Sequence, residues 1–222
     1  MPQPALQIAL RQRLTFAYAA AQISPALALL VETQAALTPD VARDIAIADA
    51  AGGVLLETDA PVSLTIGALE RVFARIAAHD QQPDPVASAA SLFAEEISAL
   101  PEPLRRHMAR AATQSGWKFS APGIRSLQLD VGSDAKVEVL RIEPGAAAPE
   151  HSHEGEEFTL VLTGAFHDAR GVYGVGDIAH ADATVTHRPT GSPGPICYSL
   201  AVTDAPLRFK GALGLVQRFW RH

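Results

Sequence analysis

Two histidines and a glutamate in the second half of the chain have the side chains and the spacing of a metal site. His151 and His153 are two residues apart, and Glu157 follows four residues after His153. Side chains an even number of residues apart on a strand point to the same face, so all three can converge if the turn at Gly155 keeps the alternation. Imidazole and carboxylate suit Zn, Fe, Mn, Ni or Cu. The alternative interpretation is a solvated, charged turn before a strand.

A third histidine further along the chain completes the pattern. Gly176 and Asp177 indicate a tight turn, and His187 comes eleven residues after Gly176. The segment that ends at His187 can form a strand on the other side of a barrel. We therefore predict a metal site, with no separate catalytic residues, made of these four ligands: His151, His153, Glu157 and His187.

Other residues with ligand chemistry fit this site less well. Glu156 has the wrong parity, and Glu154 is expected in solvent. His180 is predicted on a surface loop and His167 in a turn after a strand. Cys197, the single cysteine, lies in an apolar segment and is interpreted as a small buried hydrophobe and not as a redox thiol.

The elements that must position these ligands are strands. From Trp117 onward the apolar residues alternate with polar ones, as in the run that contains Leu127 and Leu129 and the run from Phe158 to Leu162. Glycine and proline recur at short intervals between such runs. This pattern predicts an all-β sandwich or barrel over residues 116–222.

The first half of the chain has helical periodicity instead. An uncharged stretch runs from Leu14 to Val31, but Ser24 and Pro25 interrupt it and form a helix start, so we predict two helices and no membrane span. Thr38 and Pro39 repeat that start, and the helix after them is expected to end at Gly52 and Gly53. A further helix has four apolar residues on one face: Leu69, Val72, Phe73 and Ile76.

Helices followed by strands indicate an α+β chain with separate domains. We expect a helical bundle over residues 1–78, a linker with extra helices over residues 79–115, and the β domain over residues 116–222. In the linker, one helix is expected to begin near Asp84, with Phe93 and Ile97 facing inward. Another is expected to follow Pro103, with Leu104 and Met108 facing inward.

Composition limits the function classes. The chain has 222 residues, 48% of them apolar and 19% charged, and a net charge of -6. A negative net charge argues against direct, sequence-independent binding of nucleic acid. A single cysteine excludes both an intrachain disulfide and a cysteine-based zinc site, and it favours a reducing, cytoplasmic location.

The spacing of the β domain resembles the cupin superfamily. The first cupin motif is matched by Gly145, the two histidines, Glu157 and Gly164. The second is matched by Gly176, Asp177 and His187, with Val175 near the place where proline is usual. The resemblance implies an RmlC-like jelly-roll barrel whose metal lies among these ligands.

The whole chain resembles the ChrR family of anti-sigma factors. The resemblance is carried by FAYAAAQISPALALLVETQAAL, AGGVLLETDAPVSL, HSHEGEEFTLVLTGAF and TDAPLRF with the closing LVQRFW. In that family, the helical domain holds a sigma factor of the extracytoplasmic-function (ECF) type away from core RNA polymerase. The cupin domain carries zinc and takes part in the response to singlet oxygen or organic peroxide. The family's cupin ligands fall on His151, His153, Glu157 and His187.

The chain departs from the family at a second zinc site. The helical domain of the family carries an HxxxCxxC motif, and its positions here hold Gln34, Thr38 and Val41. None of these side chains offers an imidazole or a thiolate, so we expect no zinc among the helices, which packing alone must hold together. For the partner, the low-charge stretch from Phe16 to Leu37 is the expected contact surface.

These observations favour a regulator: an anti-sigma factor that binds an ECF-type sigma factor and has a metal-binding cupin that senses oxidative stress. The implied cofactor is one divalent metal, zinc first, with Fe, Mn or Ni as alternatives. A metal-dependent cupin enzyme, a dioxygenase or isomerase whose helices form a dimerisation arm, is the alternative, and a binding module for small molecules is a third. We expect no membrane partner, and a homodimer is compatible with the sequence.

Overall fold

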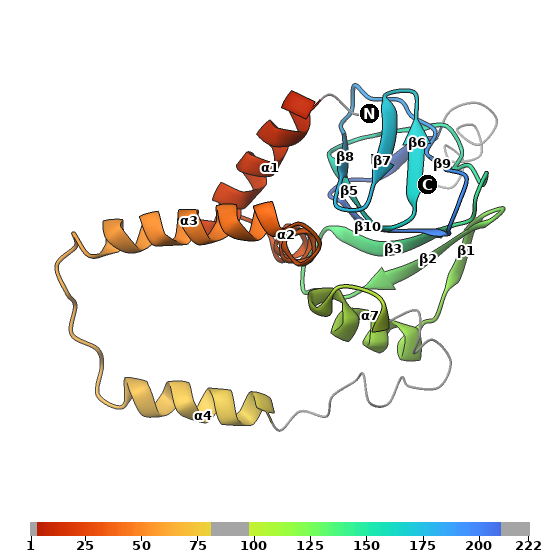
Figure 1. Cartoon of the computed structure of the whole chain (residues 1–222). Helices are drawn as coiled ribbons and strands as arrows, with labels where there is room; N and C mark the ends of the chain where they lie inside the picture. The colour runs from red at the N-terminus through yellow and green to blue at the C-terminus, as the bar shows by residue number, and fades with distance from the viewer. Residues whose placement is uncertain (1–3, 81–97, 210–222) are drawn as a thin grey trace.

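The chain folds as helices followed by strands, as predicted. The computed structural model describes residues 4–80 and 98–209 (Figure 1). The helices are α1 (Pro4–Ala19), α2 (Pro25–Leu37), α3 (Pro39–Leu56), α4 (Ala68–Asp80) and α7 (Glu102–Gln114). The strands are β1 (Lys118–Ala121), β2 (Ile124–Leu129), β3 (Lys136–Ile142), β4 (His151–His153), β5 (Glu157–Thr163), β6 (Ala165–Asp168), β7 (Gly171–Gly174), β8 (Ile178–Ala181), β9 (Thr190–Gly191), β10 (Cys197–Thr203) and β11 (Leu207–Phe209).

The β half forms the antiparallel jelly roll expected for a cupin. Its main sheet has six strands in the order β1-β2-β3-β10-β5-β8, so β10 lies between β3 and β5. A three-stranded sheet, β7-β6-β9, and the pair β11-β4 close the barrel on its other side. All seven residues of β10 are buried. A strand that is buried on both faces needs a cover on each, and here the cover is the barrel interior on one side and helices on the other.

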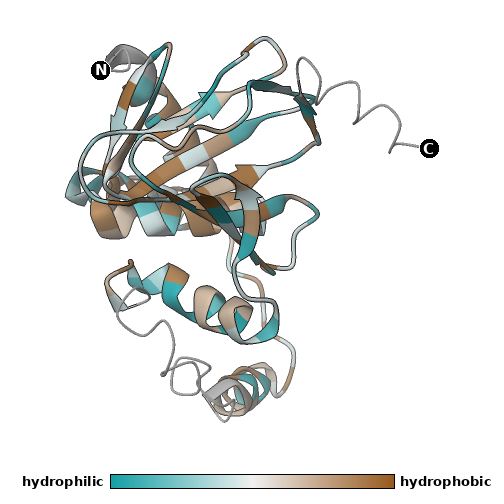
Figure 2. Cartoon of the chain, turned by 90° about the vertical axis from the view of Figure 1, so that its right-hand side faces the viewer, coloured by the Kyte–Doolittle hydropathy of each residue, from teal (hydrophilic) through white to brown (hydrophobic). Residues whose placement is uncertain are grey.

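Helices α1, α2 and α7 cover the outer face of the main sheet. One apolar cluster joins Leu30 of α2 and Leu104 of α7 to Leu127, Leu160 and Leu200 of the sheet, and all five are fully buried. A second cluster, which includes Phe166 and Tyr173, fills part of the barrel interior. Brown apolar segments of the ribbon line the layer between helices and sheet (Figure 2). The helical half therefore shares a core with the barrel, although the sequence suggested separate domains.

Helix α4 behaves differently from the other helices. It lies away from the sheet, at the end of an extended segment that follows α3 (Figure 1). The large apolar residues of α4 are exposed, as are those at the end of α3. Apolar side chains in these two places therefore have no cover within the part of the chain that the structure describes.

The predicted helix starts are confirmed, with one difference in detail. Helix α2 begins at Pro25, and the Ser24 hydroxyl accepts a hydrogen bond from the backbone N–H of Leu27 at 3.3 Å. Helix α3 begins at Pro39, but the Thr38 side chain makes no capping hydrogen bond. Its hydroxyl lies instead against Gly176, where an added Cβ would come within 2.6 Å of Thr38 Oγ1. A residue without a side chain is thus required where the helices meet the barrel.

The predicted end of α3 is wrong. The helix continues through Gly52 and Gly53 to Leu56. Neither glycine has a positive φ, so neither forms the left-handed cap that the prediction assumed. Glycine inside a helix costs about 1 kcal/mol relative to alanine, which the remaining turns of a long helix can offset.

In the linker region, α7 confirms the helix expected after Pro103, with Leu104 and Met108 buried as predicted. The helix expected near Asp84, with Phe93 and Ile97, lies outside the described residues. Among the described helices, none has both the length and the apolar character needed to cross a membrane.

Candidate metal centre

The barrel brings the four predicted ligands together. Strand β4 supplies His151 and His153, and the first residue of β5 supplies Glu157. His187 lies opposite His151, with backbone hydrogen bonds of 3.1 and 3.0 Å in the two directions. One ligand atom from each of the four side chains lies within 4.8 Å of all the others. The predicted constellation is therefore a real cluster, and metal binding by it stays a prediction.

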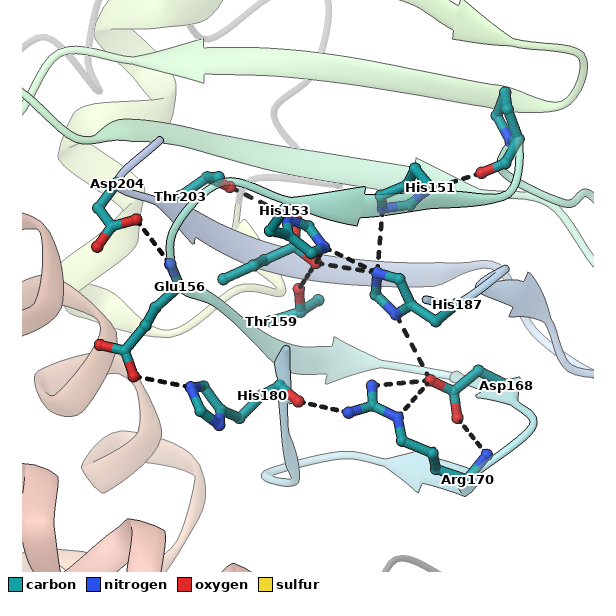
Figure 3. A network of polar contacts seen from close by, with 12 residues as sticks. His151, His153, Glu156, Thr159, Asp168, Arg170, His180, His187, Thr203 and Asp204 are labelled. Carbon is teal, nitrogen blue, oxygen red and sulfur yellow. Dashed lines mark hydrogen bonds and ion pairs between the residues drawn. The ribbon is translucent and has the colours of Figure 1, made fainter. Parts of the chain in front are cut away.

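The three imidazoles point their Nε2 atoms at a common centre. His187 Nε2 lies 3.0 Å from His151 Nε2 and 3.0 Å from His153 Nε2 (Figure 3). Glu157 Oε1 is 3.8 Å from the Nε2 atoms of both His153 and His187. Nitrogen ligands of a tetrahedral zinc at about 2.0–2.1 Å are about 3.3 Å apart, so the spacing is close to that of a metal-bound set.

Hydrogen bonds to the other ring nitrogens support the same arrangement. His151 Nδ1 lies 2.7 Å from the carbonyl oxygen of Pro149, so it carries the proton and leaves a lone pair on Nε2. His187 Nδ1 lies 3.5 Å from Asp168 Oδ2, at the limit of a hydrogen bond, and is directed in the same way. With its proton on Nδ1, a neutral His187 has only a lone pair on Nε2, and that lone pair faces the lone pair of His151 Nε2 with no proton between them. A cation at the centre would remove this conflict.

The charges of the cluster also fit a cation. Burial lowers the pKa of His151, and burial together with the two neighbouring imidazoles lowers the pKa of His153 to about 4, so both are neutral near pH 7. Burial raises the pKa of Glu157, whose oxygens lie near the hydroxyls of Thr159 and Thr203. A divalent ion would give this buried carboxylate a positive partner.

The structure adds two residues that the sequence did not reveal. The carboxylate of Asp168 is fully buried beside His187, and it accepts hydrogen bonds from the backbone N–H and guanidinium of Arg170, at 2.8 to 3.1 Å. Burial raises the pKa of Asp168, but the hydrogen bonds from His187 and Arg170 outweigh it and hold the pKa well below its usual range. An ionised Asp168 orients the His187 ring, as carboxylates do behind metal-bound histidines.

Two histidines that were excluded as ligands lie outside the cluster, but their predicted settings are wrong. His167 is in strand β6 and His180 is in strand β8, where a turn and a surface loop were expected. His180 is half-buried because its ring stacks on Phe158, and its Nε2 lies 2.9 Å from Glu156 Oε1. Glu156 points away from the cluster, as its parity predicted.

The remaining candidates agree with their predicted roles in part. Cys197 is buried, and burial raises the pKa of its thiol to about 12, so it is a packing residue, as predicted. Glu154 is not simply solvated, since it accepts a hydrogen bond of 3.0 Å from Arg208.

Beside the cluster lies a cavity of about 120 Å³. Its apolar lining includes Ile124, Leu140, Ile142, Phe166 and Leu207.

The positions of the absent helical zinc motif contact the barrel or the helical core. Gln34 is buried and donates a hydrogen bond of 2.9 Å from Nε2 to the carbonyl oxygen of Gly176. Thr38 lies against the same glycine, and Val41 is fully buried. These side chains provide packing and a hydrogen bond at positions where the family resemblance implied metal ligands.

Comparisons with known proteins agree with this architecture. Residues 105–205 match the model of the ChrR cupin-like domain family. The anti-sigma-E factor ChrR of Cereibacter sphaeroides is 39% identical over 206 residues, which cover 92% of this chain and 93% of that protein. The crystal structure of Rhodobacter sphaeroides SigE in complex with the anti-sigma ChrR is similar with a TM-score of 0.68 and 35% identity, over 87% of this chain and 96% of the matched one.

Proposed function

The chain belongs to the ChrR family of anti-sigma factors and is a regulator with a cupin domain, and we propose that its helical half binds a sigma factor of the ECF type. The related ChrR is in complex with SigE in its crystal structure, and the shared length covers both halves of this chain. In this proposal the helices bind the partner and the cupin carries the sensing site. The proposed units are residues 1–78, 79–115 and 116–222.

One observation carries the proposal: an apolar surface that no other residue in the described part of the chain covers. We call it the α3–α4 surface and define it by Val54, Leu55, Leu56, Val62, Leu64, Ile66, Leu69, Val72, Phe73 and Ile76. Every one of these side chains is at least 51% exposed, and Ile66 is 99% exposed. Monomeric proteins rarely expose so many neighbouring apolar residues unless a partner covers them.

The shape of α4 indicates how such a partner would bind. Leu69, Val72, Phe73 and Ile76 repeat at the spacing of one helical face. The other side of the helix carries Glu70, Arg71 and Arg75, so α4 is amphipathic. An amphipathic helix places its apolar face in a hydrophobic groove of the partner. The extended segment between α3 and α4 lets the two helices hold opposite sides of one protein.

The contact surface predicted from the sequence needs a correction. The stretch from Phe16 to Leu37 was expected to face the partner because it has little charge. In the structure, Leu29, Leu30 and Val31 of this stretch are 0–5% exposed because they pack against the sheet. Phe16 alone among its large apolar side chains is exposed, at 62%. The α3–α4 surface replaces that stretch as the proposed contact.

For the cupin, we propose one divalent metal held by His151, His153, Glu157 and His187. Three nitrogens and one oxygen suit Zn, Fe, Mn or Ni, and the family resemblance puts zinc first. When bound, the metal would supply a positive centre that crosslinks β4, β5 and the segment at His187. Asp168 orients His187, and Thr159 and Thr203 hold Glu157. We place the protein in the cytoplasm, where it responds to oxidative stress without binding nucleic acid directly.

The experiment is capture of a sigma factor by the full chain. The tagged chain is co-expressed with each ECF-type sigma factor encoded near its gene, and the captured complex is analysed for stoichiometry and metal. We expect a one-to-one complex and one metal per chain. His187→Ala should lose the metal and still capture the sigma factor, since His187 lies in the barrel and is not part of the α3–α4 surface. Failure to capture any of these sigma factors would contradict the proposal.

A further inference from the structure

The start of strand β5 faces the metal centre and helix α1 at the same time. Glu157 points its carboxylate into the cluster, whereas Glu156 and Phe158, on either side of it, point toward the helices. This follows from the alternation of side chains along a strand. A movement of the backbone at Glu157 therefore moves two side chains that contact α1.

Arg13 of α1 contacts both of these side chains. Its Nη2 lies 3.3 Å from Glu156 Oε1, and its guanidinium carbon lies 5.7 Å from the ring centroid of Phe158. His180 lies on the same group: its ring stacks on Phe158 at 4.8 Å and its Nε2 is 2.9 Å from Glu156 Oε1. The four side chains form one cluster between helix and barrel.

A second series of contacts links the same cluster to the other side of the metal centre. His187 Nδ1 faces Asp168, and the Asp168 carboxylate is held by Arg170. Arg170 Nη1 in turn donates to the carbonyl oxygen of His180 (Figure 3). Two ligands of the proposed metal, Glu157 and His187, are thus connected to the contacts of Arg13 by different routes.

Helix α1 has other contacts that do not pass through the metal ligands. Gln7 Nε2 donates to the carbonyl oxygen of Ile178 at 2.7 Å, and Gln7 Oε1 accepts from the Ile178 N–H at 3.4 Å. Arg11 pairs with Asp44 of α3 at 3.2 Å, within the helical half. Arg11 has the same chemistry as Arg13 and stands on the same helix, so it is a matched control.

The geometry points to Arg13 as the residue through which α1 senses the metal centre. As ligands of a bound metal, Glu157 and His187 would be held in place. Their neighbours Glu156, Phe158 and His180 would then be held as well, and Arg13 would bind these three side chains in one arrangement. Without a metal, the start of β5 would be less restrained and the docking of α1 would be weaker. This inference rests on the proposed metal site and names how that site would regulate the helical half.

The test is amide hydrogen exchange of α1 in the full chain, with and without metal. Metal is removed with a chelator, and metal content is measured on the same samples. In the native chain, metal removal should speed exchange in α1 by roughly two- to fivefold, the range that a partly exposed ion pair supplies. Arg13→Ala should keep one metal per chain but lose this difference, and Arg11→Ala should retain it.

Two outcomes would overturn the inference alone. One is a native chain with one metal whose α1 exchange does not respond to metal removal. The other is Arg13→Ala with the same response as Arg11→Ala. A native chain that binds no metal would overturn the proposed metal site and this inference with it. Sigma-factor capture is measured separately and distinguishes that failure from a failure of the anti-sigma function.

Discussion

Helices α2 and α4 have similar lengths and carry apolar residues at helical spacing, but within residues 4–80 and 98–209 only the apolar face of α2 is covered. In α2, Ala26, Leu29, Leu30 and Val31 are 0–5% exposed against the sheet. In α4, Leu69, Val72, Phe73 and Ile76 are 51–61% exposed. Burying such a side chain stabilises a structure by about 1.5–3 kcal/mol. The difference shows that α2 packs on the cupin, and it supports the proposal that α4 binds another protein.

Packing against the barrel explains how a chain without the helical zinc motif keeps α1, α2 and α7 in place. Gln34 and Val41 are buried at positions where the family resemblance implied metal ligands. The shared apolar core between α1, α2, α7 and the main sheet supplies the stabilisation. This packing holds α1, α2 and α7 on the barrel, and the apolar face of α4 does not take part in it.

The largest predicted effect is on the free energy of unfolding, and it should differ strongly between a substitution in α2 and one in α4. Leu30→Ala removes a fully buried side chain from the shared core and should lower the free energy of unfolding by about 2–5 kcal/mol. Ile76→Ala on α4 should change it by no more than about 0.5 kcal/mol. Urea denaturation of the full chain measures both. A large loss for Ile76→Ala would mean that α4 packs within the chain.

The second-largest predicted effect is on sigma-factor affinity, and here we expect α4 to matter more than α2. Phe73→Ala should weaken sigma-factor binding by about 2 kcal/mol, or roughly 30-fold, because it removes the largest side chain of the uncovered face. Arg75→Ala, on the charged side of α4, is the matched control and should have little effect. Isothermal titration calorimetry gives both affinities. Equal affinities for the two variants would remove α4 from the contact surface.

The third predicted effect is on the metal affinity of the cupin. Asp168→Asn keeps the size of the side chain but removes the charge behind His187, and we expect metal affinity to fall roughly 10-fold. The 3.5 Å separation from His187 Nδ1 puts the expected change at the lower end for such residues. Competition with a chromophoric chelator measures it. Unchanged metal affinity would show that Asp168 does not act on His187.

The smallest effect tests the contact between α2 and the barrel. Gln34→Ala loses a hydrogen bond to Gly176 and should lower the free energy of unfolding by about 1 kcal/mol. Gln12→Ala, at an exposed position of α1, should cost less. Denaturation curves of the two variants measure both losses of stability. Equal stabilities would mean that apolar packing alone holds α2 on the sheet.

The candidate site could be predicted from the sequence because strand alternation is a local rule. His151, His153 and Glu157 obey it, and the turn between β4 and β5 preserves it. Asp168 and Arg170 could not be predicted. They reach His187 and His180 only through the register of strands that are distant in the sequence, and a carboxylate near a strand end carries no local signal of that contact.

In the helical half, too, local features were predictable from the sequence and contacts between distant segments were not. The start at Ser24 and Pro25 was predictable because capping depends on neighbouring residues. What the low-charge stretch from Phe16 to Leu37 packs against was not predictable, because an apolar helix face can pack against the chain's own sheet as well as against another protein. The end of α3 was missed for a related reason: glycine permits a left-handed cap but does not require one.

The most direct test of the central claim is amide hydrogen exchange of the full chain with and without its sigma factor. We predict that complex formation slows exchange along residues 54–76, which carry the α3–α4 surface, and leaves the buried strands β5 and β10 unchanged. Unchanged exchange along α4 under conditions where the complex is fully formed would contradict the account. So would slowing that is confined to the barrel.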